Sequence, residues 1–193
     1  PTMTWVIWWV GLAYISALLG NLWALLNPLK ITFEWADSLY RRLDREGTLS
    51  FNLPYPNRLG VWPGTVLFLC FAWAEIVYTE AGMPFRIAQM VIVYSLVTWA
   101  GMLLFGKDRW IRCGDAFSIA FGFLSKFAPT ELRVLDTNIC SNCTVACLDE
   151  EGKCIDCPSC FAQAPRAMRE LNLRPFAVGL LRHESISSSM MIF

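Results

Sequence analysis

The stretch of greatest chemical interest is CSNCTVACLDEEGKCIDCPSC, residues 140–160, which holds six of the eight cysteines in the chain. Thiolates bind metal ions, and a gap of two residues lets a tight turn direct both sulfurs at one ion. Cys140 and Cys143 form one such pair, and Cys154 and Cys157 form another after ten intervening residues. Two pairs of this kind are typical of a tetrahedral four-thiolate site. The other two cysteines either extend it to a six-thiolate, two-zinc cluster, or one of them replaces a member of a pair. The predicted metal ligands are Cys140, Cys143, Cys147, Cys154, Cys157 and Cys160.

Zinc is the metal that this spacing favours, as a structural ion. The alternative is an iron–sulfur cluster, because CIDCPSC at the end of the stretch has the C-x2-C-x2-C rhythm of a ferredoxin-type site. That pattern places a proline after its fourth cysteine, whereas here Pro158 follows Cys157. Disulfide bonds are the third interpretation, and they require an oxidising compartment.

The rest of the chain predicts an all-α integral membrane protein. Of its 193 residues, 55% are hydrophobic and 17% are charged, and the mean hydropathy is +0.43. The apolar residues fall in long blocks, which predict three full transmembrane helices at Thr2–Leu26, Val61–Tyr78 and Ile87–Phe105. The formal net charge is zero, so no global basic field points to nucleic acid. Because an apolar run begins just as the chain stops at Phe193, we also expect the start of a fourth span and a longer polypeptide.

Composition shifts divide the chain into six segments. We expect a first transmembrane helix (1–29), a cytoplasmic amphipathic helix and connector (30–60), a transmembrane hairpin (61–105), an interfacial helix region (106–135), a cysteine-rich metal-binding module (136–164) and a basic segment leading to a further span (165–193). The amphipathic helix is predicted from apolar residues at i, i+3 and i+4 spacing from Phe33 to Leu43. It suits the membrane surface, or equally a contact with other loops.

One face of the first apolar block favours close helix packing. Ser16, Gly20 and Ala24 recur every four residues, and such small residues let a neighbouring helix approach closely. We therefore expect contacts with membrane lipid and with other membrane-protein subunits through this face.

The distribution of basic residues predicts which side of the membrane holds the cysteines. Lys and Arg number five between residues 30 and 58, one between the second and third expected spans, and ten between 107 and 182. Basic residues accumulate on the cytoplasmic side of bacterial inner-membrane proteins. The sequence therefore predicts a multi-pass protein of that membrane with a cytoplasmic cysteine-rich module, where metal ligation is favoured over disulfides.

Other catalytic chemistry has little support in the residues. His183 is the one histidine, which excludes a multi-His metal centre within this chain. Glu75 is the carboxylate within an expected span; a proton relay is one interpretation, but its place near the end of the span favours a structural role. The chain contains no Gly-rich phosphate loop, no H-E-x-x-H and no G-x-S-x-G motif. Whether it is an enzyme therefore stays open.

Three stretches resemble a known family. GNLWALLNP (Gly20–Pro28), GKDRWIRCGDAFSIAFGFLSKFAPTE (Gly106–Glu131) and RPFAVGLL (Arg174–Leu181) are similar to bacterial polytopic membrane proteins labelled fenitrothion hydrolase-like or uncharacterised. The resemblance implies a longer protein with more spans. It implies no catalytic residue, because no catalytic motif maps onto these positions, and the six-cysteine stretch is not part of the family pattern.

These observations lead to three expected functions. The first is an accessory or structural component of a membrane complex with a cytoplasmic Cys-ligated zinc site. The second is an electron-transfer subunit that carries an iron–sulfur cluster in the module. The third is a transporter or membrane hydrolase whose active residues lie outside this chain.

Overall fold

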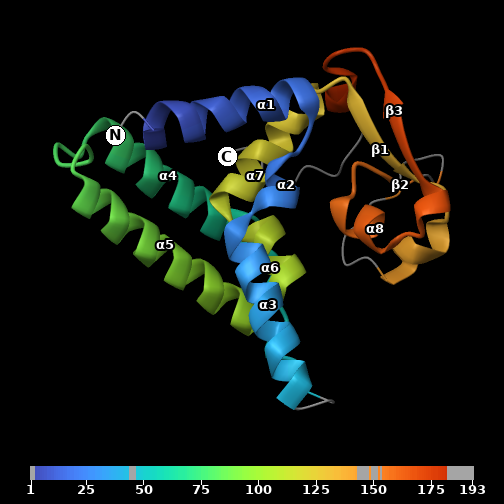
Figure 1. The fold of residues 1–193 in the computed structure, drawn as a ribbon, viewed down its shortest axis with the longest axis horizontal. Coiled ribbons are helices and arrows are strands. Elements are labelled where there is room, and N and C mark those ends of the chain that lie inside the picture. Colours follow the sequence, from blue (N-terminus) through green and yellow to red (C-terminus); the bar gives the residue numbers. More distant parts are fainter. Residues whose placement is uncertain (1–2, 44–46, 143–147, 149–151, 153, 182–193) are drawn as a thin grey trace. The chain divides into compact units, whose positions relative to one another are not determined.

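The computed structural model describes residues 3–43, 47–142, 148, 152 and 154–181 (Figure 1). Its chain contacts define two compact units. The helical unit contains the described residues of 3–12 and 25–120, and the sheet unit contains those of 13–24 and 121–181.

The helical unit consists mainly of helices. They are the π-helix η1 (Met3–Val10), α3 (Pro28–Leu43), α4 (Trp62–Ile76), α5 (Pro84–Phe105), α6 (Lys107–Cys113) and the start of α7 (Ala116–Leu124). Helix η1 continues into α1 (Gly11–Leu19), most of which belongs to the sheet unit. Local sequence sets several of their ends. The side-chain oxygen of Asn27 accepts hydrogen bonds from the backbone N–H groups of Leu29 and Lys30 and so caps α3. Proline stands in the first turn of α4 and of α5, where its missing N–H costs no helical hydrogen bond.

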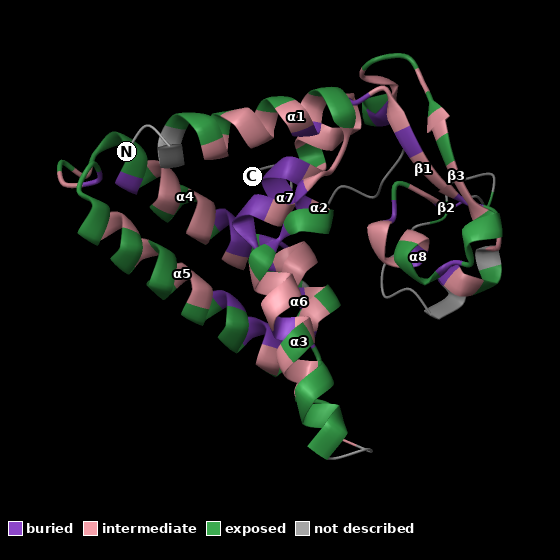
Figure 2. Cartoon of the chain, viewed as in Figure 1, coloured by how far each residue is buried: buried purple, intermediate pink, exposed green. Residues whose placement is uncertain are grey.

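Aromatic side chains fill the core of this unit. Phe33 of α3 packs with Met102 of α5, Trp110 of α6 and Tyr55 of the connector. A second group surrounds Phe117, whose ring lies 5.0–5.7 Å from ring centroids of Trp8, Trp9, Phe71 and Tyr94. Figure 2 shows that buried residues concentrate at the start of α7 and at the C-terminal end of α5, while the rest of α5 is largely exposed; in α6 the buried residue is Trp110.

The prediction of three full transmembrane helices is wrong. Among the described residues, α5 is the one helix long and apolar enough to cross a membrane, with 22 residues that give a length of about 33 Å. The predicted second span is the 15-residue helix α4, about 22 Å long, which falls short of a hydrocarbon thickness of about 30 Å.

The predicted first span is interrupted. Helix α1 ends at Leu19, Gly20 adopts a φ of +111°, and a new four-residue helix, α2 (Trp23–Leu26), follows. Glycine pays no steric penalty in this left-handed region, so it ends the helix where hydropathy alone suggests continuity. Asn21 then accepts a hydrogen bond from the backbone N–H of Ala24 and stabilises the turn. The predicted start of a fourth span falls on residues 182–193, outside the described residues.

The sheet unit contains a small antiparallel sheet that the all-α prediction did not include. Strands β1 (Thr130–Val134), β2 (Cys154–Ile155) and β3 (Arg169–Leu173) lie in the order β2-β1-β3. Arg133 pairs with Ile155 on one side and with Glu170 on the other. Helix α8 (Pro158–Gln163) follows β2 directly. β1 and β3 are mostly polar and β2 has two residues, so they lack the apolar run that marks a strand in a sequence.

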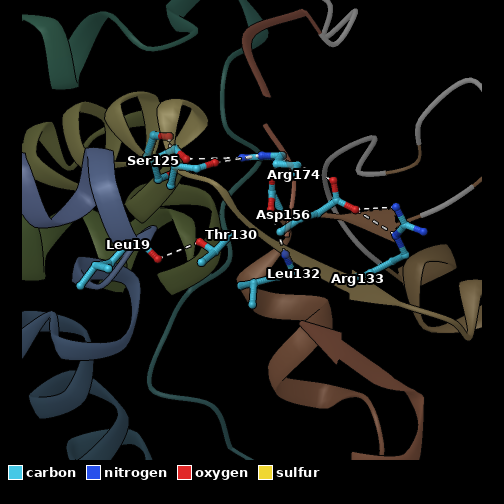
Figure 3. A network of polar contacts seen from close by, with 10 residues as sticks. Leu19, Ser125, Thr130, Leu132, Arg133, Asp156 and Arg174 are labelled. Carbon is cyan, nitrogen blue, oxygen red and sulfur yellow. Dashed lines mark hydrogen bonds and ion pairs between the residues drawn. The ribbon is translucent and has the colours of Figure 1, made fainter. Parts of the chain in front are cut away.

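The three small residues expected to face a partner lie on different elements. Ser16 is on α1 and fully buried, Gly20 is in the break, and Ala24 is on α2. At the break the hydroxyl of Thr130 donates a hydrogen bond to the carbonyl of Leu19 (2.7 Å; Figure 3). The expected contact with another subunit stays a prediction.

Candidate metal centre

The sheet unit gathers four cysteines from three elements. Cys140 lies on the 3-10 helix η4 (Thr137–Asn142), and Cys154 begins β2, where it pairs with Val134 of β1. Cys157 directly precedes α8, and Cys160 lies in the first turn of that helix. Pro158 starts α8 immediately after Cys157, and Pro165 ends it, because a residue that precedes proline disfavours the α conformation. Local sequence therefore turns the chain sharply at both ends of the second cysteine pair.

The thiols of Cys140, Cys154 and Cys160 converge. Their sulfur atoms all lie within 4.8 Å of one another, and the Sγ atoms of Cys140 and Cys160 are 3.7 Å apart. That separation far exceeds the S–S bond length of about 2.0 Å. It matches the sulfur–sulfur edge of about 3.8 Å that four thiolates form around one tetrahedral zinc ion with Zn–S distances of about 2.3 Å. The arrangement fits one tetrahedral metal ion.

The surroundings of these thiols are dry and apolar. Cys140, Cys154, Cys157 and Cys160 are at most 8% exposed, and they form one buried cluster with Val134 and Ala164. Ile139 and Phe161 pack against the outside of the cluster. A metal ion with thiolate ligands tolerates such a setting, because the cation offsets the charge of the thiolates and sulfur needs few hydrogen bonds.

Asp156 anchors the turn between Cys154 and Cys157. It adopts a φ of +53°, a left-handed conformation that Asp tolerates better than most residues. Its backbone N–H donates to the carbonyl of Leu132 (2.8 Å), and its carboxylate accepts from the N–H of the same residue (3.1 Å). These two bonds attach the cysteine-bearing turn to β1.

Arg174 holds the other side of the Asp156 carboxylate. Its Nη1 atom lies 2.6 Å from Asp156 Oδ2, and its Nε atom donates to the carbonyl of Ala128 (3.0 Å). Nη2 points to the carbonyl of Ser125 (3.5 Å), so the guanidinium joins the turn to the segment before β1 (Figure 3). Glu131 Oε2 lies 3.8 Å from Nη1, and its other oxygen is paired with Arg133 (2.6 Å). Charge-assisted bonds of this kind fix the position of the turn that carries Cys154 and Cys157.

The structure therefore brings together part of the predicted ligand set. Cys140, Cys154 and Cys160 form a group of thiols that could hold a metal ion, and Cys157 is buried in the same cluster. Cys143 and Cys147 lie outside the described residues. The remaining cysteines, Cys70 and Cys113, belong to helices of the other unit. Burial raises the pKa of the Cys113 thiol, which the guanidinium groups of Arg109 and Arg112 partly offset.

Sequence reasoning missed the residues that hold the site in place. Asp156 carries a weak signal, since it stands in a two-residue gap between cysteines, but Arg174 lies 18 positions away with no motif that links the two. It also missed Asp115, a fully buried carboxyl group in the helical unit. Glu75, which the sequence singled out, is exposed.

Three side chains donate to that buried carboxyl group. Asn27 Nδ2 donates to Asp115 Oδ2 (2.9 Å), the Ser118 hydroxyl donates to the same oxygen, and the Tyr94 hydroxyl donates to Oδ1. These residues come from the cap of α3, from α5 and from the start of α7. Asp115 thus joins three elements through a buried polar cluster.

Comparisons of the chain with protein-family models, with curated proteins and with solved structures find no match. The resemblance to fenitrothion hydrolase-like membrane proteins stays an expectation. The geometry of the cysteine site is therefore the main indication of function.

Proposed function

We propose that this chain is part of a membrane protein whose sheet unit is held together by one structural zinc ion, and that it serves as an accessory component of a membrane complex. The convergence of three buried thiols within 4.8 Å carries the proposal. Cys157 is the fourth ligand best supported by position, because it is buried in the same cluster. Cys143 and Cys147 are the other cysteines of the predicted set.

The spacing of the thiols favours a single ion over an iron–sulfur cluster. Two thiolates on one tetrahedral ion lie about 3.8 Å apart, which agrees with the 3.7 Å between Cys140 and Cys160. Thiolates on a cluster bind different iron atoms and lie farther apart than thiolates that share one metal. The burial of the site also suits a closed structural ion, since the described thiols of the cluster are at most 8% exposed.

Helix α5 supports the membrane location. Most of its apolar window is uncovered by the described chain, as expected of a helix that lies in lipid. Lys107, Arg109 and Arg112 directly follow its C-terminal end, whereas Arg86 is the basic residue at its N-terminal end. This asymmetry supports a cytoplasmic C-terminal end for α5, and hence a cytoplasmic cysteine site. A reducing compartment keeps thiols available for a metal.

Elemental analysis of the anaerobically purified chain tests the proposal. We expect a colourless protein with one zinc per chain, and a Cys154→Ser variant that loses most of the metal. Cys70→Ser is the matched control, because Cys70 is exposed on α4 and distant in sequence from the site. Visible absorbance with several irons and inorganic sulfide per chain, or no bound metal at all, would overturn the zinc proposal.

Thiol labelling from each side of the membrane tests the location of the site. After chelation, a membrane-impermeant thiol reagent should label the cluster from the cytoplasmic side of vesicles. Labelling from the outer side, and after reduction alone, would contradict both the location and the metal site.

A further inference from the structure

Helix α3 leaves a large part of its apolar side uncovered. Phe33 is 3% exposed and packs into the core of the helical unit. Trp35, Leu39 and Leu43 are spaced four residues apart from one another, and they are 71%, 62% and 83% exposed. Residues at this spacing share one side of a helix. We call these three residues the α3 stripe; in Figure 2 the C-terminal half of α3, which carries Leu39 and Leu43, is exposed.

The stripe begins at the level where the apolar length of α5 ends. Phe33 contacts the cluster that contains Met102 near the C-terminal end of α5. One residue further along α3, Glu34 Oε1 pairs with Lys107 Nζ at 2.8 Å, and Lys107 is the second residue after α5. Helix α3 is thus attached to the end of the one described helix that has the length and composition of a span.

A second exposed apolar segment lies at the same end of α5. Phe51 and Leu53 are 74% and 48% exposed. Their backbone N–H groups donate to the carbonyls of Leu103 and Leu104 (2.7 and 2.8 Å). Exposed apolar side chains therefore collect around the C-terminal end of α5 from two separate parts of the sequence.

Basic groups accompany these apolar side chains. Arg41 and Arg42 stand in the last turn of α3, and Arg109 lies over the ring of Tyr55 next to the same end of α5. Tryptophan and arginine together suit the boundary between headgroups and acyl chains, where indole rings lie at the headgroup level and cations approach anionic lipids.

From this geometry we infer that the α3 stripe lies on the surface of an anionic lipid bilayer, with Trp35, Leu39 and Leu43 in the boundary between headgroups and acyl chains. The inference rests on the proposed membrane location of α5. Lipid is favoured over a protein partner because the stripe begins one residue after the Glu34–Lys107 ion pair, at the end of a helix whose apolar window is mostly uncovered, so that one apolar medium would cover both. The flanking Arg42 adds attraction to anionic headgroups, whereas Arg41 is paired with Asp37 (2.9 Å).

Site-specific photo-crosslinking in the full chain tests the inference. A diazirine amino acid replaces Leu39, and in separate samples Ser38 or Ile92, in protein reconstituted into phosphatidylcholine vesicles with or without phosphatidylglycerol. Ser38 is the control on an exposed polar position of the same helix, and Ile92 is a 58% exposed position on α5. We expect lipid adducts at Leu39 and Ile92, a several-fold lower yield at Ser38, and a lower yield at Leu39 when phosphatidylglycerol is omitted.

The three positions separate the possible failures. Lipid adducts at Ile92 without adducts at Leu39 would overturn the docking of α3 and leave the membrane location standing. No lipid adducts at either position would overturn both. Adducts between Leu39 and a protein, whether a second copy of this chain or another subunit, would assign the stripe to a protein interface instead. Equal yields at Leu39 with and without phosphatidylglycerol would contradict the anionic requirement. Metal content of each sample checks that the sheet unit is folded.

Discussion

Asp115 shows how single polar residues organise the apolar part of this protein. Its carboxyl group is fully buried and accepts hydrogen bonds from Asn27, Ser118 and Tyr94. Asn27 in turn caps α3 with its other side-chain atom. A buried donor without an acceptor costs about 1–3 kcal/mol, so removal of the carboxyl group should affect all three elements at once.

We expect Asp115→Leu to destabilise the helical unit by about 3 kcal/mol, because it leaves the donors of Asn27 and Tyr94 without their acceptor. Asp115→Asn keeps the shape and one acceptor oxygen and should cost less. The measurement is thermal unfolding in detergent, followed by tryptophan fluorescence. Equal unfolding temperatures for the Leu variant and the unmodified protein would contradict the role given to Asp115.

Tyr55 makes the stability of the helical unit sensitive to alkaline pH. Burial raises the pKa of its phenol to about 12, with a smaller contribution from Cys113 and an opposing one from Arg109. The Tyr55 hydroxyl donates to the carbonyl of Gly60 (2.8 Å). Since the folded-state pKa lies above the unfolded value of about 10, this contribution is complete below about pH 10 and is lost as pH rises toward 12.

We therefore expect the unmodified protein to lose about 1 kcal/mol more stability than Tyr55→Phe between about pH 9 and about pH 11. Unfolding temperatures of both proteins at the two pH values provide the comparison. The variant lacks the ionisable group and shares every other one, so parallel losses in the two proteins would disprove the effect.

At the scale of elements, Gly101 allows α6 to fold back on α5. A Cβ atom at Gly101 would lie 2.1 Å from the ring of Trp110, and one at Gly114 would lie 2.5 Å from the same ring. Trp110 is buried and stacks on Phe105, with ring centroids 5.9 Å apart. The indole would therefore have to leave this stacked position to admit a larger residue.

Gly101→Ala should destabilise the contact between α5 and α6 by about 2 kcal/mol, although alanine is the better helix former. Gly82→Ala is the matched control, because a Cβ atom there meets nothing within 4 Å. Chemical unfolding in mild detergent compares the two variants. A Gly101→Ala variant as stable as the control would show that Trp110 is not constrained in this way.

At the scale of the whole molecule, the two units depend on different forces. The helical unit has an aromatic core, whereas the sheet unit combines short strands, a two-residue β2 and a cluster of cysteines. All six predicted metal ligands follow residue 120, so they belong to the part of the chain that forms the sheet unit. Small units with little core generally need a metal or another crosslink to fold stably.

We expect chelation of the proposed metal to unfold the sheet unit and leave the helical unit folded. Hydrogen exchange should speed up by more than about tenfold for amides of Thr130–Val134 in β1. Amides of Met102 to Phe105 at the end of α5 should keep their protection. Unchanged protection of β1 after full removal of the metal would argue that the ion is not structural.

Much of the local structure is predictable from the sequence. The apolar block at Ile87–Phe105 lies within α5, the amphipathic spacing from Phe33 to Leu43 lies within α3, and prolines mark the starts of α4, α5 and α8. Hydropathy overestimated the lengths of the first two predicted spans. A hydropathy window averages over many residues, so it does not detect a single glycine at φ +111° or the end of α4 at Ile76.

The cysteine pattern by itself indicated thiolate ligation, since the two-residue gaps are a local property of the chain. Tertiary structure decided which thiols meet: Cys140, Cys154 and Cys160 converge through the pairing of β2 with β1 and the turn into α8. It also decided that Arg174 and Asp156 hold that turn, and that Asp115 lies buried between Asn27 and Tyr94. These contacts join residues 18 to 88 positions apart. Sequence periodicity reports only on neighbours within a few turns, so such contacts become visible only once the chain has folded.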